Sequence, residues 1–269
     1  MEAVGTALVT GASRGIGRAV ALDLADAGFD VVATMRNSAD GEGLARDGSE
    51  GRGGIRVARL DVDDPESIDL PGDLRVLVNN AGIERQYLPL ESIDVADWRA
   101  VFETNLFGLV EVTRRAIPIL RAGGGGVICN VTSSSILAAV PFYTLYRASK
   151  AAVSALGESL RTEVAQFGIR VVEIMPGPVE TDMLARSDRV PEAAQLPGYR
   201  ELALASHEQR KGAGVHSTPA PLAARRIRDA ILDDAGPLKV GCDPLAEGLL
   251  EAWSADPVAL VGRAYERTE

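Results

Sequence analysis

Two residues that could transfer protons, Tyr146 and Lys150, lie four positions apart in a stretch with helical apolar spacing. Residues at i and i+4 share one face of a helix, which would place the ammonium beside the phenol. Lowering a phenol pKa from about 10 toward 7 requires roughly 4 kcal/mol. An ammonium at about 4 Å supplies about 1 kcal/mol in water and about 4 kcal/mol at an effective dielectric of 20. The pair therefore predicts acid–base chemistry in a largely dry pocket; a solvent-exposed pair without a catalytic role is the alternative.

A glycine-rich turn, TGASRGIG at residues 10–17, stands between an apolar run and a helical pattern. Glycine permits a tight turn and close backbone approach, and the following helix offers free N–H groups to a pyrophosphate. The turn differs from G-x-G-x-x-G, but its place in the first strand–helix–strand unit favours a dinucleotide site over a plain connection.

The residues after the second predicted strand indicate which dinucleotide binds. An acidic side chain there would bond the ribose hydroxyls, whereas the sequence has Arg36, whose planar fork suits a 2′-phosphate. Arg14 could add a second positive charge. We therefore expect NADP(H) in preference to NAD(H), although both residues could be solvated surface arginines in a chain with 25 arginines.

Further polar residues follow the expected strands or interrupt helical stripes. Asp61 could accept a hydrogen bond from an adenine amino group or cap the next helix. Asn79 begins an Asn-Asn-Ala-Gly turn whose small residues let the backbone approach a flat ligand, and Ser133 lies in a hydroxyl-rich turn suited to polarising a carbonyl. Asn105 falls on an apolar helical stripe, where its amide either bonds a backbone kink or belongs to a site.

The elements that would position these residues alternate between short apolar runs and helical patterns, which is typical of a parallel sheet with crossover helices. The 269 residues favour one domain, 1–269, with a weakly patterned segment at about 183–220 acting as a substrate lid. We expect strands at residues 6–10, 29–35, around 57–60, 76–79, 127–131, 169–174 and 238–241, and helices at 16–27, 98–120, 146–166, 221–232 and 244–265.

The composition excludes several other classes. A net charge of −10 argues against nucleic acid or an anionic membrane as the main partner. No apolar run is long enough to span a bilayer and no signal peptide is visible, so we expect a cytoplasmic protein. We expect Cys129 to be a buried thiol. His207 and His216 have no further Cys or His nearby in the sequence, so we expect no metal site.

Together, the ordered motifs between residues 5 and 182 resemble the short-chain dehydrogenase/reductase family. The resemblance implies an α/β fold: a Rossmann-type, doubly wound sheet of about seven parallel strands with helices on both faces, a three-layer αβα sandwich. It also implies hydride transfer between nicotinamide C4 and a carbonyl or alcohol carbon. By position, Ser133 polarises the carbonyl, Tyr146 is the acid or base, Lys150 holds the nicotinamide ribose and lowers the tyrosine pKa, and Asn105 anchors a relay water. Ser134 and Ser135 are the alternatives if the serine turn aligns differently.

The resemblance also assigns a set of cofactor-binding residues, with Val179 and Thr181 meeting the carboxamide. The set is Gly11, Ser13, Arg14, Gly15, Ile16, Gly17, Arg36, Asp61, Val62, Asn79, Ala81, Gly82, Tyr146, Lys150, Pro176, Gly177, Val179 and Thr181. Only 17 residues separate Asp61 from Asn79, so the crossover between the third and fourth strands is shorter than the family's usual one.

The expected function is an NADP(H)-dependent oxidoreductase acting on a lipophilic carbonyl or secondary alcohol, because the sequences around 33–36 and 141–143 are similar to hydroxysteroid and retinol dehydrogenases. Candidate substrate-wall residues are Gln86, Tyr87, Ile136, Val140, Phe142, Tyr143, Met183, Leu184 and Tyr199. The alternatives are an NAD-preferring member of the same family and a dinucleotide-binding redox sensor without turnover; a serine hydrolase is disfavoured because no G-x-S-x-G elbow occurs. The family often assembles through its two long helices, so the resemblance implies a homodimer or homotetramer.

Overall fold

The computed structural model describes residues 1–47, 52–212 and 217–258 and contains one seven-stranded sheet, all of whose pairings are parallel. The strand order is β3-β2-β1-β4-β5-β6-β7. The strands are β1 (Thr6–Val9), β2 (Asp30–Met35), β3 (Ile55–Arg59), β4 (Leu74–Asn79), β5 (Gly126–Val131), β6 (Ile169–Met175) and β7 (Lys239–Gly241). This is the predicted Rossmann-type fold. The order reverses between β1 and β4, and ligands of such sheets bind beyond the carboxyl ends of the strands at that point.

The register of the sheet explains its continuous apolar runs. One row across the sheet, Ala33–Val9–Val78–Cys129–Val172, faces one hydrophobic cluster. The neighbouring row, Val32–Leu8–Leu77–Ile128–Val171, faces the other. Because both faces of the central strands are covered, polar alternation is absent from their sequences.

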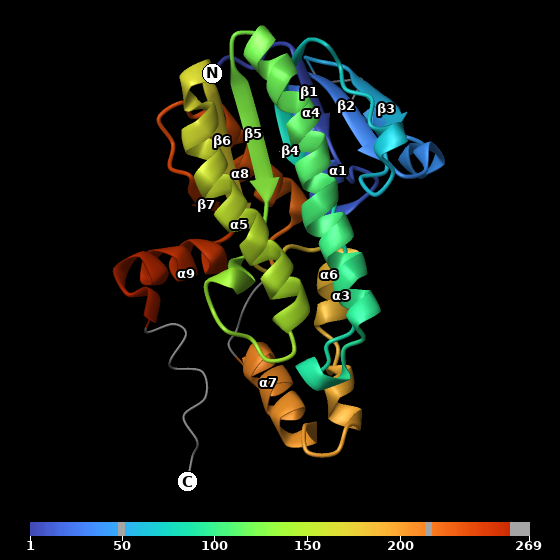
Figure 1. Cartoon of the computed structure of the whole chain (residues 1–269), viewed down its shortest axis with the longest axis vertical. Coiled ribbons are helices and arrows are strands. Elements are labelled where there is room, and N and C mark those ends of the chain that lie inside the picture. The colour runs from blue at the N-terminus through green and yellow to red at the C-terminus, as the bar shows by residue number, and fades with distance from the viewer. Residues whose placement is uncertain (48–51, 213–216, 259–269) are drawn as a thin grey trace.

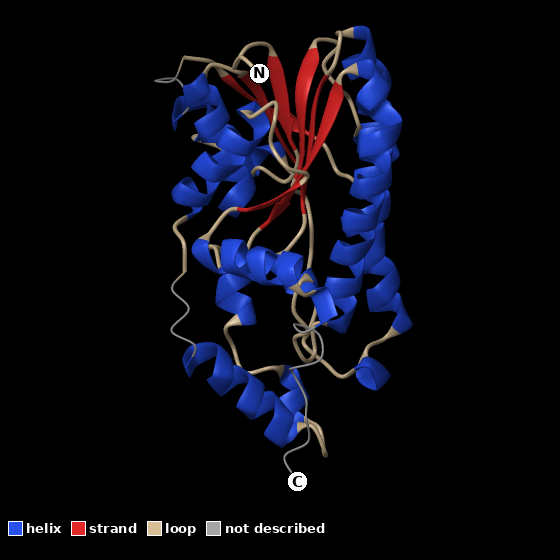
Figure 2. Ribbon diagram, turned by 90° about the vertical axis from the view of Figure 1, so that its left-hand side faces the viewer, coloured by secondary structure: helices blue, strands red, loops and turns tan. Residues whose placement is uncertain are grey.

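Helices cover both faces of the sheet (Figure 2). The first face carries α1 (Gly15–Ala27) and α8 (Ala220–Leu232), which pack against each other. The second carries α4 (Leu109–Ala122) and α5 (Thr144–Val164). The short α2 (Leu44–Asp47) follows a 3-10 turn at Ser38–Gly41, and α9 (Pro244–Ala255) follows β7.

The helix expected at 98–120 is interrupted. It consists of α3 (Val95–Phe102), a π-helical segment at Glu103–Gly108 and α4. The π segment contains Asn105, which is buried. A π-helical insertion shifts the helical register by one residue, and such insertions are frequent at functional sites.

The connections also differ from a simple alternation. The crossover between β3 and β4 contains only a 3-10 turn at Pro65–Ser67, in keeping with its short length. The segment after β6 contains α6 (Asp182–Ser187), a 3-10 turn at Glu192–Gln195 and α7 (Arg200–Gly212), where the sequence had shown only weak patterning. Both helices lie beyond the carboxyl ends of the strands (Figure 1). The helix expected at 244–265 ends at Ala255, and its last predicted residues, like His216, fall outside the described part of the chain.

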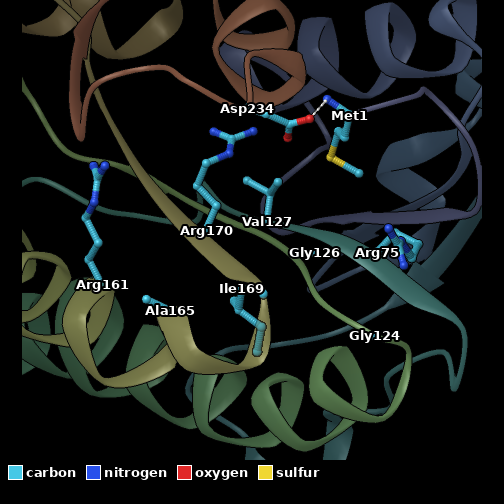
Figure 3. A pocket seen from close by; sticks show the side chains of 11 residues that line it. Met1, Arg75, Gly124, Gly126, Val127, Arg161, Ala165, Ile169, Arg170 and Asp234 are labelled. Atoms are coloured by element: carbon cyan, nitrogen blue, oxygen red, sulfur yellow. Dashed lines mark ion pairs between the residues drawn. The ribbon is translucent and has the colours of Figure 1, made fainter.

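A cavity of about 460 Å³ lies at the opposite, amino-terminal edge of β5 and β6 (Figure 3). Its polar groups form hydrogen bonds and an ion pair that hold the end of α8 in place. The amino terminus of Met1 donates to the Leu232 carbonyl and forms an ion pair of 2.8 Å with Asp234. Arg170 donates to the carbonyls of Ala230 and Ile231, and these bonds satisfy the last carbonyls of α8.

Three features of the described residues concern membranes, thiols and metals. None of their helices is long and apolar enough to cross a membrane. Cys129 and Cys242 are both buried free thiols. His207 is buried in α7, and the described residues contain no cluster of three metal-ligating side chains.

Candidate active site

A cavity of about 840 Å³ lies at the carboxyl edge of the sheet and brings most of the predicted site residues together. It is lined by the glycine turn, the ends of β2 to β5, the beginning of α5 and the segment from β6 into α6. Among the predicted residues, the lining contains Gly11, Ser13, Arg14, Gly15, Ile16, Gly17, Arg36, Asp61, Val62, Ala81, Gly82, Ser133, Tyr146, Lys150, Pro176, Gly177, Val179, Thr181, Met183 and Leu184.

The glycine turn is packed so closely that side chains are excluded from it. Gly11 has a φ of +65°, and a Cβ there would lie 2.9 Å from the Cα of Ala81. A Cβ on Gly17 would lie 2.4 Å from Nδ2 of Asn80 and 2.5 Å from the Gly11 carbonyl oxygen. The turn thus presents backbone directly to the cavity, next to the N-terminus of α1, which fits the pyrophosphate of a dinucleotide.

Asn79 was predicted to bind the cofactor, but it does not line the cavity. Its side chain is buried in the core, where Nδ2 donates to Thr113 Oγ1 and to Asn130 Oδ1, both at 2.9 Å. Asn80 lines the cavity instead, and its Nδ2 donates to the carbonyls of Thr10 and Gly11 at 3.0 and 3.1 Å. Successive strand residues point to opposite faces of the sheet. The prediction therefore chose the asparagine that faces the core in place of its neighbour that faces the cavity.

Tyr146 and Lys150 share the inner face of α5, as their spacing predicted. Lys150 is 4% exposed, its Nζ donates to the Val131 carbonyl at 2.8 Å, and it lies 5.9 Å from the centroid of the Tyr146 ring. Gly82 passes beside this ammonium, since a Cβ there would lie 3.4 Å from Nζ. The end of β5 and the turn after β4 therefore fix the lysine head in one place.

The protein groups perturb both pKa values, but the tyrosine shift is opposite to the expected one. Burial raises the pKa of Tyr146 above its ordinary value of 10.0, and the charge of Glu84 raises it further, while a hydrogen bond with Ser133 lowers it. Burial also lowers the pKa of Lys150 to about 8. For the protein groups taken alone, the pKa of Tyr146 is therefore raised, not lowered as expected, and Lys150 is not among the groups that shift it.

Ser133 is the serine of the turn that bonds Tyr146. It caps the 3-10 turn at Ser134–Ile136, and its Oγ accepts from the backbone N–H of Ser135 at 3.2 Å and from Ser135 Oγ at 2.9 Å. Ser134 is buried and does not line the cavity. The arrangement therefore favours Ser133 over its two neighbours as the side chain nearest the phenol.

Asn105 lies directly behind the cavity wall without lining it. Its Oδ1 accepts from the Ile83 N–H at 2.8 Å, and its Nδ2 donates to the Ile83 carbonyl at 2.9 Å and to Ser149 Oγ at 3.0 Å. A Cβ on Gly82 would lie 3.3 Å from Oδ1. The buried amide thus fixes the turn after β4 against α5, close to Lys150.

The end of the cavity near β2 and β3 is lined by charged side chains. Arg36 is exposed and lines the cavity, as does Asp40. Asp61 lines it too, and its Oδ1 accepts from the Asp63 N–H at 3.2 Å. The 3-10 turn at Pro65–Ser67 is capped by Asp64 and not by Asp61. Arg14 forms an exposed ion pair of 3.4 Å with Asp182, so it joins the glycine turn to the first residue of α6.

The opposite end of the cavity differs from the predicted apolar wall. Met183 and Leu184 line it, together with Glu84, Arg85 and Arg186. The remaining predicted wall residues do not line the cavity: Gln86, Tyr87, Ile136, Val140, Phe142, Tyr143 and Tyr199. Aromatic members of this group form a separate cluster, in which Tyr87 stacks on Tyr143 at 4.5 Å and Phe142 meets Tyr199 edge-on at 6.2 Å. Sequence reasoning missed Glu84, although its position two residues after Gly82 was a signal.

Comparisons with known proteins agree with this arrangement. The family model described as short chain dehydrogenase matches residues 5–191. A curated relative, sulfoacetaldehyde reductase 2 of Chromohalobacter salexigens, is 35% identical over 203 residues, which cover 72% of this chain and 80% of the relative. Human retinol dehydrogenase 8 is 36% identical over 202 residues, covering 72% of this chain and 65% of that protein.

The solved structures give the same result. A short chain dehydrogenase from Burkholderia cenocepacia in complex with NADP matches with a TM-score of 0.75 and 27% identity, over 99% of this chain and all of the other chain (100%). The chain therefore belongs to the short-chain dehydrogenase/reductase family of NAD(P)-dependent oxidoreductases.

Proposed function

We propose that the chain is an NADP(H)-dependent oxidoreductase that transfers a hydride between the nicotinamide and the carbon of a carbonyl or secondary alcohol. One observation carries the proposal: Ser133, Tyr146 and Lys150 line the same cavity as the glycine turn. A proton donor, a second hydrogen-bond donor and a cation thus lie beside the place where a dinucleotide fits.

The protein groups divide the proton chemistry among them. In reduction, the Tyr146 hydroxyl donates its proton to the substrate oxygen, and in oxidation the phenolate removes the proton from the alcohol. Ser133 donates a hydrogen bond to the same oxygen, where negative charge develops. Lys150 orients the nicotinamide ribose, and Asn105 anchors the water through which the phenol exchanges its proton.

The cofactor also bears on the acidity of Tyr146. When bound, the nicotinamide supplies or accepts the hydride, and its oxidised ring adds a positive charge that favours the phenolate. That charge opposes the burial and the Glu84 carboxylate that raise the pKa of Tyr146. Without the charge of the oxidised ring, the phenol is thus better suited to donating a proton in reduction.

The preference for NADP(H) rests on Arg36 and Arg14. Both line the cavity near the glycine turn, and the residues that follow β2 include no carboxylate before Asp40. A guanidinium bonds a 2′-phosphate through two oxygens, whereas NAD offers it no such partner. The solved neighbours include complexes with NADP and with NAD, so the preference is proposed from these two arginines alone.

The substrate that we propose is a carbonyl compound or secondary alcohol with a lipophilic body. Met183 and Leu184 supply the apolar contacts, and retinol dehydrogenase 8 is among the relatives. We also propose that residues 183–220 act as a lid within a single domain. A cytoplasmic homodimer or homotetramer assembled through α4 and α5 completes the proposal.

The deciding experiment mixes the purified protein with ketones and NADPH, or alcohols and NADP, and follows the absorbance of the reduced nicotinamide; parallel reactions use NADH and NAD. We expect turnover that is faster with the phosphorylated cofactors. Tight cofactor binding without turnover of any ketone or alcohol would instead favour the dinucleotide-binding redox sensor. Tighter binding of NADH than NADPH would favour the NAD-preferring alternative.

A further inference from the structure

A carboxylate on the cavity wall is not used by the chemistry described above. Glu84 lies two residues after Gly82 and directly after Ile83, whose backbone is held by Asn105. Its side chain is 6% exposed and lines the same cavity as Ser133 and Tyr146. The backbone that carries this carboxylate is therefore fixed from behind by the buried amide.

The two oxygens of Glu84 differ in their partners. Oε2 accepts a short hydrogen bond of 2.5 Å from the Tyr87 hydroxyl. Oε1 is buried and has no hydrogen-bond partner among the described residues. Nε of Arg186 lies 3.7 Å from it, which is beyond hydrogen-bonding distance. Buried carboxylate oxygens are normally satisfied, so an unpaired one beside a ligand cavity requires an explanation.

The ion pair with Arg186 neutralises this carboxylate only in part. The Arg186 side chain is 52% exposed, so solvent screens much of its charge. A second carboxylate, that of Glu192, accepts from the Tyr87 N–H at 3.0 Å and adds negative charge to the same region. Burial raises the pKa of Glu84, and its charge acts on Tyr146, so the carboxylate lies within electrostatic reach of the reacting group.

We propose that Oε1 of Glu84 accepts a hydrogen bond from a donor on the substrate, either a hydroxyl or an ammonium group, carried a few atoms from the reacting carbon. The inference rests on the proposed function and narrows its substrate class. Met183 and Leu184 contact the lipophilic part of such a molecule, and its donor replaces the long contact from Arg186.

A purely structural role for Glu84 predicts different behaviour. In that case the carboxylate only ties the loop after β4 to Tyr87 and to α6, and substrates with and without a donor are treated alike. Tyr87→Phe removes the hydroxyl that bonds Oε2 but leaves Oε1 free to act. Glu84→Gln keeps an acceptor oxygen without the charge, and Glu84→Leu removes both.

The experiment uses aliphatic ketones of equal length, each with a hydroxyl, an ammonium or a methyl group two to four carbons from the carbonyl. We measure kcat/KM with NADPH for the natural protein and the three variants, and cofactor binding and thermal unfolding report whether each variant is folded. At one distance of the substituent from the carbonyl, we expect kcat/KM of the natural protein to be roughly tenfold to a hundredfold higher for the donor than for the methyl group. Glu84→Leu abolishes this preference, Glu84→Gln keeps it for the hydroxyl and loses it for the ammonium, and Tyr87→Phe keeps it for both.

Two results overturn the inference: no preference for a donor at any position, or the same preference in Glu84→Leu as in the natural protein. Absence of turnover with every ketone contradicts the proposed function instead. Calorimetric binding of the same compounds to the NADP-loaded protein then decides the inference, because binding requires no turnover.

Discussion

Lys150 donates a hydrogen bond of 2.8 Å to the carbonyl of Val131, the last residue of β5. The ammonium that lies one helical turn beyond Tyr146 is thus bound to the strand from which the Ser133 turn departs. Two elements separated in the sequence therefore fix the distance between the cation and the serine. This bond also explains how a lysine can be 4% exposed, because its charge keeps a strong acceptor.

The buried ammonium makes stability depend on pH. The pKa of Lys150 is about 8 in the fold and ordinarily 10.5, so between these values the unfolded chain holds a proton that the folded chain lacks. Stability contributed by this group therefore rises with pH through that window. Urea unfolding of the cofactor-free natural protein and of Lys150→Met at pH 7, 9 and 10 should show the difference between them changing in favour of the natural protein. A difference that is constant with pH would contradict the buried, shifted ammonium.

Removing the phenol hydroxyl tests the assigned proton donor. We expect Tyr146→Phe to lower kcat/KM by about 10²- to 10⁴-fold, the usual contribution of a general acid, and to leave NADPH binding within a few-fold. Steady-state absorbance and fluorescence titration measure the two quantities. Tyr199→Phe is the matched control, because Tyr199 bonds Glu91 outside the cavity and should change activity little. Equal activity in the two variants would refute the assignment.

A methyl group in the glycine turn tests the dinucleotide site. Gly17→Ala places a carbon against Asn80 and the Gly11 carbonyl, so we expect a loss of about 1–3 kcal/mol in stability and at least about tenfold in NADPH affinity. Gly72→Ala is the control, since nothing lies within 4 Å of its Cβ position. Thermal unfolding and cofactor titration measure both variants. Normal affinity in Gly17→Ala would show that the turn tolerates a side chain and does not hold the pyrophosphate.

Arg36 provides the test of cofactor preference. Loss of a charged hydrogen bond of about 1.5–3 kcal/mol should weaken NADPH binding in Arg36→Ala roughly tenfold to a hundredfold, with NADH binding nearly unchanged. Arg56→Ala removes the same charge from an exposed position outside the cavity and should leave both affinities unchanged. If the two variants behave alike, the phosphate contact lies elsewhere.

Much of the fold was predictable because its signals are local. Continuous apolar runs marked the strands, since both faces of the central sheet are buried, and the 3.6-residue spacing marked α1, α5 and α8. The sequence also indicated that the crossover after β3 is short. Each of these signals depends on residues close together in the sequence, and the packing of the folded protein favours the same elements.

The features that could not be predicted depend on contacts between distant segments. Asn79 and Asn80 have the same chemistry, and only the facing of the strand end decides which one reaches the cavity. The π-helical segment contains Asn105, which bonds Ile83 and Ser149 from distant parts of the chain. The tyrosine pKa depends on burial and on Glu84, which were not visible from the spacing of Tyr146 and Lys150.

The start of α6 lies against the glycine turn, where a Cβ on Gly15 would be 3.1 Å from Cγ2 of Thr181. The next residues, Met183 and Leu184, form part of the opposite end of the cavity. The start of α6 thus contacts both the proposed dinucleotide site and the proposed substrate site. If the dinucleotide and the substrate favour the same position of α6, the binding of each must affect the binding of the other. Any factor by which the dinucleotide strengthens the affinity for the second ligand must then equal the factor by which that ligand strengthens retention of the dinucleotide.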